Sequence, residues 1–92
     1  MQVITSKDNE IVKSVKKLKD KKYREEEGLY VIEGIKMLEE AIEEKANIKR
    51  IIICDECLKA EDLEQKLLYE IAKYNCVYVN SKVFNFLSVF KA

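Results

Sequence analysis

The residues that could carry chemistry in this 92-residue chain are its cysteines, carboxylates and lysines. The sequence contains no histidine. The lack of histidine excludes Ser-His-Asp and Cys-His catalysis and every histidine-containing metal site. The two glycines, Gly28 and Gly34, are too few for the glycine-rich loops that cradle phosphates. Composition alone therefore excludes most common kinds of active site.

Cys54 and Cys57 form a C-x-x-C pair, the spacing of redox dithiols and of half a zinc site. Cys76 lies 19 residues further on, so zinc would need a carboxylate as its fourth ligand, which is uncommon. Asp55 and Glu56 stand between the paired cysteines and disfavour the thiolate that redox chemistry requires. We therefore expect three reduced thiols and neither a zinc site nor a redox site.

Among the carboxylates, Glu33 has the most informative position. It directly follows the apolar run Leu29–Ile32 and precedes Gly34. Open parallel sheets bind ligands at the carboxyl ends of their strands, so Glu33 is a candidate binding residue. The alternative is that Glu33 caps the following helix while Gly34 permits close packing. We expect the other carboxylates to lie on solvated surfaces.

The net charge of zero conceals a strongly uneven distribution. Residues 1–24 carry eight basic and three acidic side chains, a net charge of +5. Residues 25–70 carry six basic and fourteen acidic side chains, and residues 71–92 carry three basic and no acidic ones. The chain thus has a basic amino-terminal arm and an acidic body, and a basic arm suits a phosphate-bearing partner.

The basic arm contains the candidate RNA-binding residues. Lysines on one side of an expected helix are followed by the cluster Lys21-Lys22-Tyr23-Arg24, which combines three cations for phosphate with one aromatic ring. The candidates for binding RNA are Lys13, Lys16, Lys17, Lys21, Lys22 and Arg24, together with Glu33. A basic cluster of this kind is also compatible with a plain solvated surface.

Hydrophobic periodicity predicts helices that alternate with short strands. We expect helices that begin near 8–9, 35, 61 and 81, strands at 29–32, 51–54 and 77–79, and a fourth strand near Val3-Ile4. The run 19–27 has only one apolar residue, Tyr23, and is expected to be an exposed connection with at most a helical turn. Strands separated by helices pair in parallel, so the predicted fold class is α/β, a three-layer α/β/α sandwich around a small, mostly parallel sheet.

Ninety-two residues suffice for one domain, and neither a membrane span nor a secretory signal is present in the sequence. Apolar residues are dense near the end, at Phe84, Phe86, Leu87, Val89 and Phe90. We therefore expect residues 1–92 to form one domain of a longer cytoplasmic protein, with a further domain after residue 92.

The spacing of several motifs between residues 4 and 53 matches one known family. The motif residues are Ile4-Thr5-Ser6, Asn9, Val12-Lys13, Leu18, Lys21-Lys22-Tyr23-Arg24, Gly28, Val31-Ile32-Glu33-Gly34, Ala41 and Arg50-Ile51-Ile52-Ile53. This region resembles the N-terminal substrate-binding domain of SpoU/TrmH-type RNA 2′-O-methyltransferases, especially the rRNA-modifying branch that includes thiostrepton-resistance enzymes. The family's proline after the first Asn is replaced by Glu10, which should change only the local entry into the helix.

The resemblance implies an L30e-like fold and an RNA substrate, with rRNA as the expected one. It also implies a C-terminal knotted domain that binds S-adenosylmethionine and transfers the methyl group. By resemblance, Arg24 and Glu33 take part in RNA recognition, supported by the surrounding lysines. Nothing in residues 1–92 corresponds to the knot, so this part should be non-catalytic and hold no cofactor. The family dimerises through the knotted domain, so a homodimer is expected for the whole protein and a monomer for this part.

Two alternatives remain open from the sequence. The chain could be a stand-alone L30e-like RNA-binding protein. It could instead be a protein-interaction module in which Phe84, Phe86 and Phe90 pack against a partner and the lysines are merely solvated.

Overall fold

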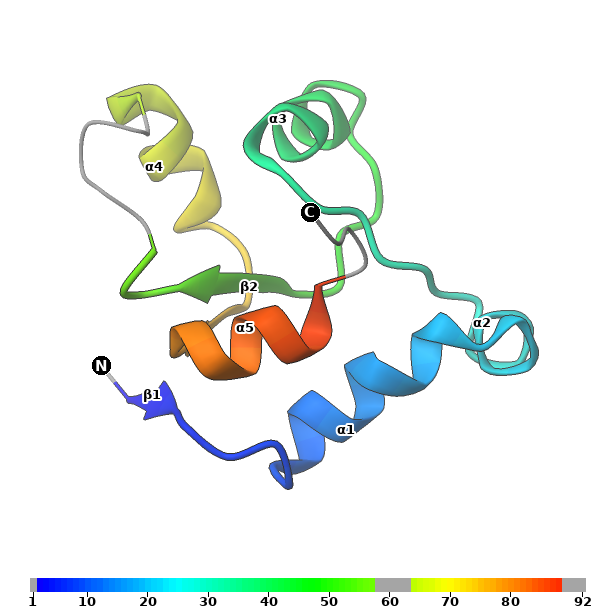
Figure 1. The fold of residues 1–92 in the computed structure, drawn as a ribbon. Coiled ribbons are helices and arrows are strands. Elements are labelled where there is room, and N and C mark those ends of the chain that lie inside the picture. Colours follow the sequence, from blue (N-terminus) through cyan, green and yellow to red (C-terminus); the bar gives the residue numbers. More distant parts are fainter. Residues whose placement is uncertain (1, 58–63, 89–92) are drawn as a thin grey trace.

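The computed structural model describes residues 2–57 and 64–88, which form a small three-stranded parallel sheet flanked by helices (Figure 1). The elements in chain order are β1 (Val3–Ile4), α1 (Glu10–Lys16), the 3-10 helix η1 (Lys17–Lys19), α2 (Lys21–Glu27), α3 (Ile35–Glu43), β2 (Ile51–Cys54), α4 (Gln65–Ile71), β3 (Cys76–Val79) and α5 (Ser81–Leu87). None of the helices in the described residues has the length and apolarity needed to cross a membrane.

Strand β3 occupies the centre of the sheet, in the order β1-β3-β2. Tyr78 of β3 lies opposite Val3 on one side and Ile53 on the other, and both pairings are parallel. The expected strand at Val3-Ile4 is therefore present. The strand expected at 77–79 begins one residue earlier, at Cys76.

Successive residues of a strand point to opposite faces, and the two faces of this sheet are covered by different helices. Helices α1 and α5 lie on one face, and α3 and α4 lie on the other (Figure 1). The first core consists of Val12, Val79, Val83 and Leu87 with Ile4, Val15, Ile52 and Val77 against it. The second consists of Ile51, Leu67 and Ile71 with Leu38, Ile42, Ile48 and Ile53 among its neighbours. This arrangement confirms the predicted α/β class and is compatible with three layers.

Polar side chains cap the first turns of α1 and α5 at the positions that the sequence predicts. The Asn9 side chain accepts hydrogen bonds from the backbone N–H groups of Ile11 and Val12, so α1 begins as expected. The Asn80 side chain accepts from Val83 N and begins α5. Helix α4 extends from Gln65 to Ile71. Residues 61–63, where it was expected to begin, and Val89 and Phe90 lie outside the described residues.

The segment 19–27 is more helical than its sequence predicts. Asp20 accepts a hydrogen bond from Lys22 N and begins α2, which continues for two turns to Glu27. Gly28 then adopts a left-handed conformation with φ 68°, which L-residues with a side chain adopt only at a cost. A good N-cap and a good C-cap thus define a helix that has almost no apolar stripe.

The prediction of a strand at Leu29–Ile32 is wrong. These residues form an extended link between α2 and α3, and among the described residues they pair with no strand. Their side chains do alternate, because Leu29 and Val31 are partly buried while Tyr30 is 76% exposed. The apolar run therefore has the conformation of a strand, but β1 and β2 are the edges of the described sheet and neither takes it as a neighbour.

The expectation of three reduced thiols is wrong for two of them. Cys54 ends β2, the chain turns at once, and Cys57 returns to form a disulfide with Cys54. Cys76 is free, and its thiol donates a hydrogen bond to the carbonyl oxygen of Ile71 at 3.3 Å. Burial raises the pKa of the Cys76 thiol above its ordinary value, so this thiol stays protonated near neutral pH. No cluster of three potential metal-ligating side chains occurs in the parts described.

The core between α1 and α5 generates a stability prediction. Val83 is completely buried, so Val83→Ala should lower the free energy of unfolding by about 2 kcal/mol through lost transfer energy and a residual cavity. Urea denaturation followed by circular dichroism measures the change. The exposed neighbour Lys82→Ala is the matched control and should change the midpoint little. Equal midpoints for the two variants would contradict the assignment of Val83 to the core.

Candidate nucleic-acid interface

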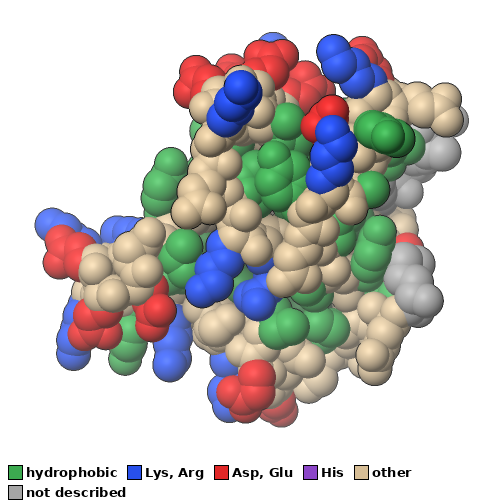
Figure 2. Space-filling model, turned by 180° about the vertical axis from the view of Figure 1, so that it is seen from behind, with side chains coloured by type: hydrophobic (Ala, Val, Ile, Leu, Met, Phe, Trp, Pro, Cys, Tyr) green, Lys and Arg blue, Asp and Glu red, His purple; other side chains and the backbone are tan. Residues whose placement is uncertain are grey.

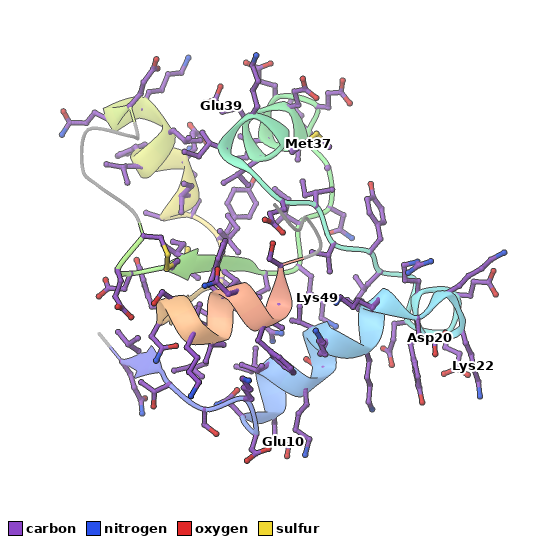
Figure 3. All side chains as sticks on the ribbon, in the orientation of Figure 1. Glu10, Asp20, Lys22, Met37, Glu39 and Lys49 are labelled. Carbon is purple, nitrogen blue, oxygen red and sulfur yellow. A yellow bond between two sulfur atoms is a disulfide. The ribbon has the colours of Figure 1, made fainter. Side chains whose placement is uncertain are left out.

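Most of the basic side chains of the amino-terminal arm project from one continuous wall made by α1, η1 and α2. Helix α1 faces the core through Val12, while Lys13 of α1 and Lys17 of η1 are exposed. Helix α2 carries Lys21 and Lys22 outward at the end of the molecule farthest from the sheet (Figures 1 and 3). We call the surface formed by α1, η1 and α2, with the side chains of Lys13, Lys17, Lys21 and Lys22, the basic wall.

The acidic side chains of α3 lie at a different place from the basic wall, although α2 carries Glu25, Glu26 and Glu27 beside its basic residues. Figure 2 shows a group of red side chains over the α3 end of the molecule, while blue side chains alternate with red around α2. Glu39 on α3 lies far from Lys22 (Figure 3). The charge asymmetry of the sequence is therefore also an asymmetry in space, which can orient the domain on an anionic partner.

Tyr23 links the two parts of the basic wall. The ammonium of Lys17, from η1, lies 5.4 Å from the centre of the Tyr23 ring, and that of Lys22 lies 6.0 Å away. Both distances are within the range of cation–π attraction. The predicted grouping of lysines around an aromatic side chain is thus present, and it includes a lysine from outside the Lys21–Arg24 cluster.

Ion pairs on the basic wall are weak. Lys13 lies 3.5 Å from Glu10 and Lys21 lies 3.9 Å from Glu25, and all four side chains are largely exposed. Exposed pairs of this kind contribute roughly 0–1 kcal/mol, so a phosphate group can replace the carboxylate at little cost.

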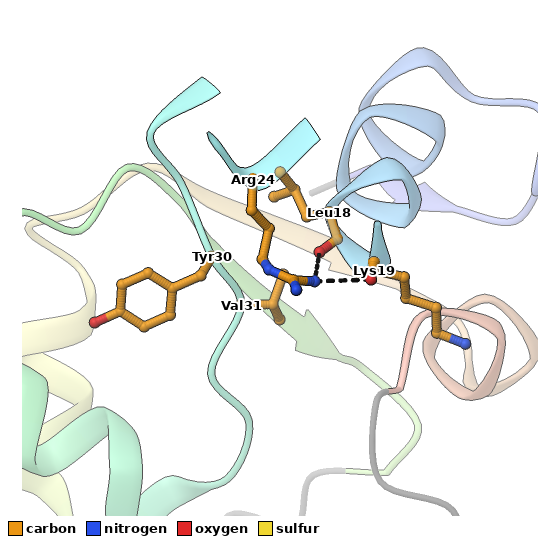
Figure 4. Close-up of a pocket in the computed structure, with 5 residues that line it drawn as sticks. All are labelled: Leu18, Lys19, Arg24, Tyr30 and Val31. Carbon is orange, nitrogen blue, oxygen red and sulfur yellow. Dashed lines mark hydrogen bonds between the residues drawn. The ribbon is translucent and has the colours of Figure 1, made fainter. Parts of the chain in front are cut away.

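Arg24 is held by the backbone of the preceding 3-10 helix. Its Nη1 donates to the carbonyl oxygens of Leu18 at 2.9 Å and Lys19 at 2.7 Å (Figure 4). These carbonyls belong to the end of η1, where intrahelical partners are lacking. These partners show that Arg24 fixes the corner between η1 and α2 through Nη1. Its contact with RNA stays a prediction. It also lines an open hollow of about 470 Å³ with Leu18, Lys19, Tyr30 and Val31.

Glu33 connects two distant parts of the chain. Its two carboxylate oxygens lie 2.9 and 2.8 Å from the Ser88 hydroxyl, which donates a hydrogen bond to the carboxylate. Ser88 directly follows α5, so the contact joins the α2–α3 link to the end of that helix. In the alternative interpretation Glu33 caps α3. The N-cap residue of α3 is instead Gly34, and the Glu33 carboxylate contacts Ser88.

Lys16, the remaining predicted residue, is turned toward α5. Its ammonium donates to the carbonyl oxygen of Phe86 at 2.6 Å and lies 4.1 Å from the centre of the Phe86 ring. Lys7, which the sequence does not single out, lies 5.0 Å from the same ring centre. No spacing signal could have found this group, because Lys7 and Phe86 are 79 residues apart.

The comparison with protein families assigns the domain. A family model described as the MRM3-like substrate binding domain matches residues 9–91. The chain belongs to this family. No curated protein and no solved structure matches it.

The match to the MRM3-like substrate binding domain includes every predicted site residue, from Lys13 to Glu33, and both residues of the Glu33–Ser88 contact. Lys7 and strand β1 lie before the matched region. The aromatic residues Phe84 and Phe86 of the MRM3-like domain pack partly buried against the core between α1 and α5. For these two rings, this packing does not favour the alternative in which Phe84, Phe86 and Phe90 pack against a protein partner; Phe90 lies outside the described residues.

The contacts of Arg24 predict its effect on stability. Because charge-assisted hydrogen bonds to the backbone are lost, Arg24→Ala should lower the free energy of unfolding by about 1–2 kcal/mol. Arg24→Lys should retain only part of this stabilisation, since an ammonium cannot reproduce the forked geometry of the guanidinium. Thermal unfolding of both variants beside Lys22→Ala, an exposed neighbour, provides the measurement. If Arg24→Ala and Lys22→Ala melt alike, the carbonyl contacts do not hold the corner.

Proposed function

We propose that this domain binds RNA, specifically the rRNA substrate of a 2′-O-methyltransferase of the SpoU/TrmH type, in the branch that includes thiostrepton-resistance enzymes. Membership in a substrate-binding domain family supports a role in holding the substrate. The observation that carries the choice of RNA is the basic wall, where exposed lysines surround Tyr23 at the end of the molecule away from acidic α3. Cations with an aromatic ring are the groups that bind phosphates and unstacked bases.

In this mechanism the predicted residues divide into two groups. Lys13, Lys17, Lys21 and Lys22 contact phosphates, and their weak ion pairs are exchanged for the RNA backbone. Arg24 acts as a positioning residue because its Nη1 holds the corner that presents Tyr23 and Lys22. Glu33 likewise positions the link between α2 and α3 through Ser88.

S-adenosylmethionine, the expected methyl donor, does not fit the residues described. Two open hollows among the described residues are lined by lysines or arginine and by apolar side chains. Such a lining favours an anion and disfavours the positively charged sulfonium of this cofactor. We propose that the methyl donor, the transfer step and homodimer formation belong to a separate C-terminal domain of the same cytoplasmic protein, and we assign recognition alone to this domain.

Titration against a structured rRNA fragment tests the proposed function. Fluorescence anisotropy at two salt concentrations should show binding that weakens steeply with salt, because lysine contacts release counterions. The double variant Lys17→Glu/Lys22→Glu should bind at least tenfold more weakly and show a salt slope lower by about 2.

The matched control is Lys36→Glu/Lys45→Glu, which makes the same change of charge at exposed positions on and after α3. It should reduce affinity far less than the basic-wall variant. Equal losses would show that only net charge matters, and binding that ignores salt would refute phosphate recognition by lysines.

A further inference from the structure

A second aromatic ring, Phe86 of α5, lies beside lysines of α1, of η1 and of the segment that precedes α1. Lys7, Lys13, Lys16, Lys17 and Phe86 line a shallow groove of about 310 Å³ between α1 and α5. This volume is at the lower end of the roughly 300–1,000 Å³ range of small-ligand sites. We call this feature the Phe86 groove.

The Phe86 groove is built on rigid elements. Helix α5 is fixed by Val83 and Leu87, which are buried against Val12 and Val79. The amino end of α5 is held by Asn80 and by the Glu56 carboxylate, which accepts from Ser81 N at 3.0 Å.

Lys16 further fixes Phe86 itself through the hydrogen bond to its carbonyl oxygen and the contact with its ring. The aromatic ring therefore occupies a defined position beside the lysines of α1 and η1.

The composition of the groove identifies the chemical class of its ligand. Four lysines line the groove together with one aromatic ring, and the ammonium groups of Lys7 and Lys16 lie 5.0 and 4.1 Å from the centre of that ring. Among the described ion pairs, the acid beside these lysines is Glu10, which is 90% exposed in its weak pair with Lys13. A positively charged groove that contains an aromatic platform is the arrangement that binds single-stranded nucleic acid. An acidic peptide would also use the lysines, but a nucleotide supplies both a phosphate for them and a flat base that stacks on the ring.

We propose that the Phe86 groove is a subsite for one unpaired nucleotide of the RNA, with the base against the Phe86 ring and the flanking phosphates on Lys7, Lys13 and Lys17. This inference rests on the proposed function and adds a base-contacting site to it. Lys7 is exposed and its ammonium lies 5.0 Å from the ring centre, farther than that of Lys16. The base takes the place of Lys7 at the ring, and the released ammonium moves to a phosphate.

A single-tryptophan variant tests the subsite directly, because the chain contains no tryptophan. In Phe86→Trp a stacked base should quench the tryptophan fluorescence. The probe is a short single-stranded oligoadenylate, and an abasic oligonucleotide of the same length supplies the phosphates alone. Quenching is expected with oligoadenylate and not with the abasic strand.

Phe84→Trp is the matched control, since Phe84 lies on the same helix, packs against the same core and does not line the groove. Its fluorescence should not change when oligoadenylate binds. Quenching of both variants to the same extent would show a general effect of bound RNA and would overturn the proposal.

Affinity measurements provide a second readout. Phe86→Leu keeps an apolar side chain for packing but loses the ring, so it should bind oligoadenylate about tenfold more weakly and the abasic strand equally well. Lys7→Ala should weaken binding to both strands severalfold. Urea denaturation of Phe86→Leu checks that the fold is retained.

The outcomes separate this inference from the proposed function. If Phe86→Trp binds RNA by anisotropy without quenching, the subsite is refuted while RNA binding by the basic wall stands. If the unaltered chain binds neither the rRNA fragment nor oligoadenylate, the proposed function fails and the subsite fails with it.

Discussion

Helices α5 and α1 pack against each other on one face of the sheet, over the central strand β3. The remaining features of the structure depend on this contact. Val83 and Val12 meet over Val79 of β3, and all three are almost completely buried. This contact fixes the direction of α5, and α5 then contributes to two long-range contacts. Phe86 reaches Lys16 on α1, and Ser88, which follows the helix, reaches Glu33 in the link before α3.

Helix α1 serves two roles because its two sides are chemically distinct. Val12 and Val15 join the core, whereas Lys13 projects into solvent and Lys16 turns along the boundary to α5. The apolar stem of a lysine can cover hydrophobic surface while its ammonium stays near polar groups. The same helix thus stabilises the fold and supports the basic wall, which couples the position of the lysines to the integrity of the core.

The parts of the structure that the sequence predicts well are those governed by local rules. The cap at Asn9, the strand Ile51–Cys54 and the helix after Asn80 follow from side-chain type and spacing, and they are present. Strand pairing is a non-local property, so the run Leu29–Ile32 could be recognised as extended but not as unpaired. The contacts of Arg24 and Phe86 join groups that only the folded chain brings together, so the sequence does not reveal them. Helix α2 is defined by its caps and lacks the hydrophobic periodicity from which a helix is predicted.

The division of the basic residues into positioning and exposed groups has a consequence for specificity. Lysine–phosphate contacts set register and affinity but carry no sequence information, whereas base contacts do. Arg24, the basic side chain best suited to bidentate recognition, already uses Nη1 for the corner of η1 and α2. Under the proposed function, unstacked bases, the shape of the RNA and the spacing of its phosphates therefore contribute to discrimination between RNAs in addition to any arginine contact. Among the described residues, Tyr23 and Phe86 are rings flanked by lysines of η1 and α1, and under the proposed function a substrate with unpaired nucleotides suits them better than a continuous duplex.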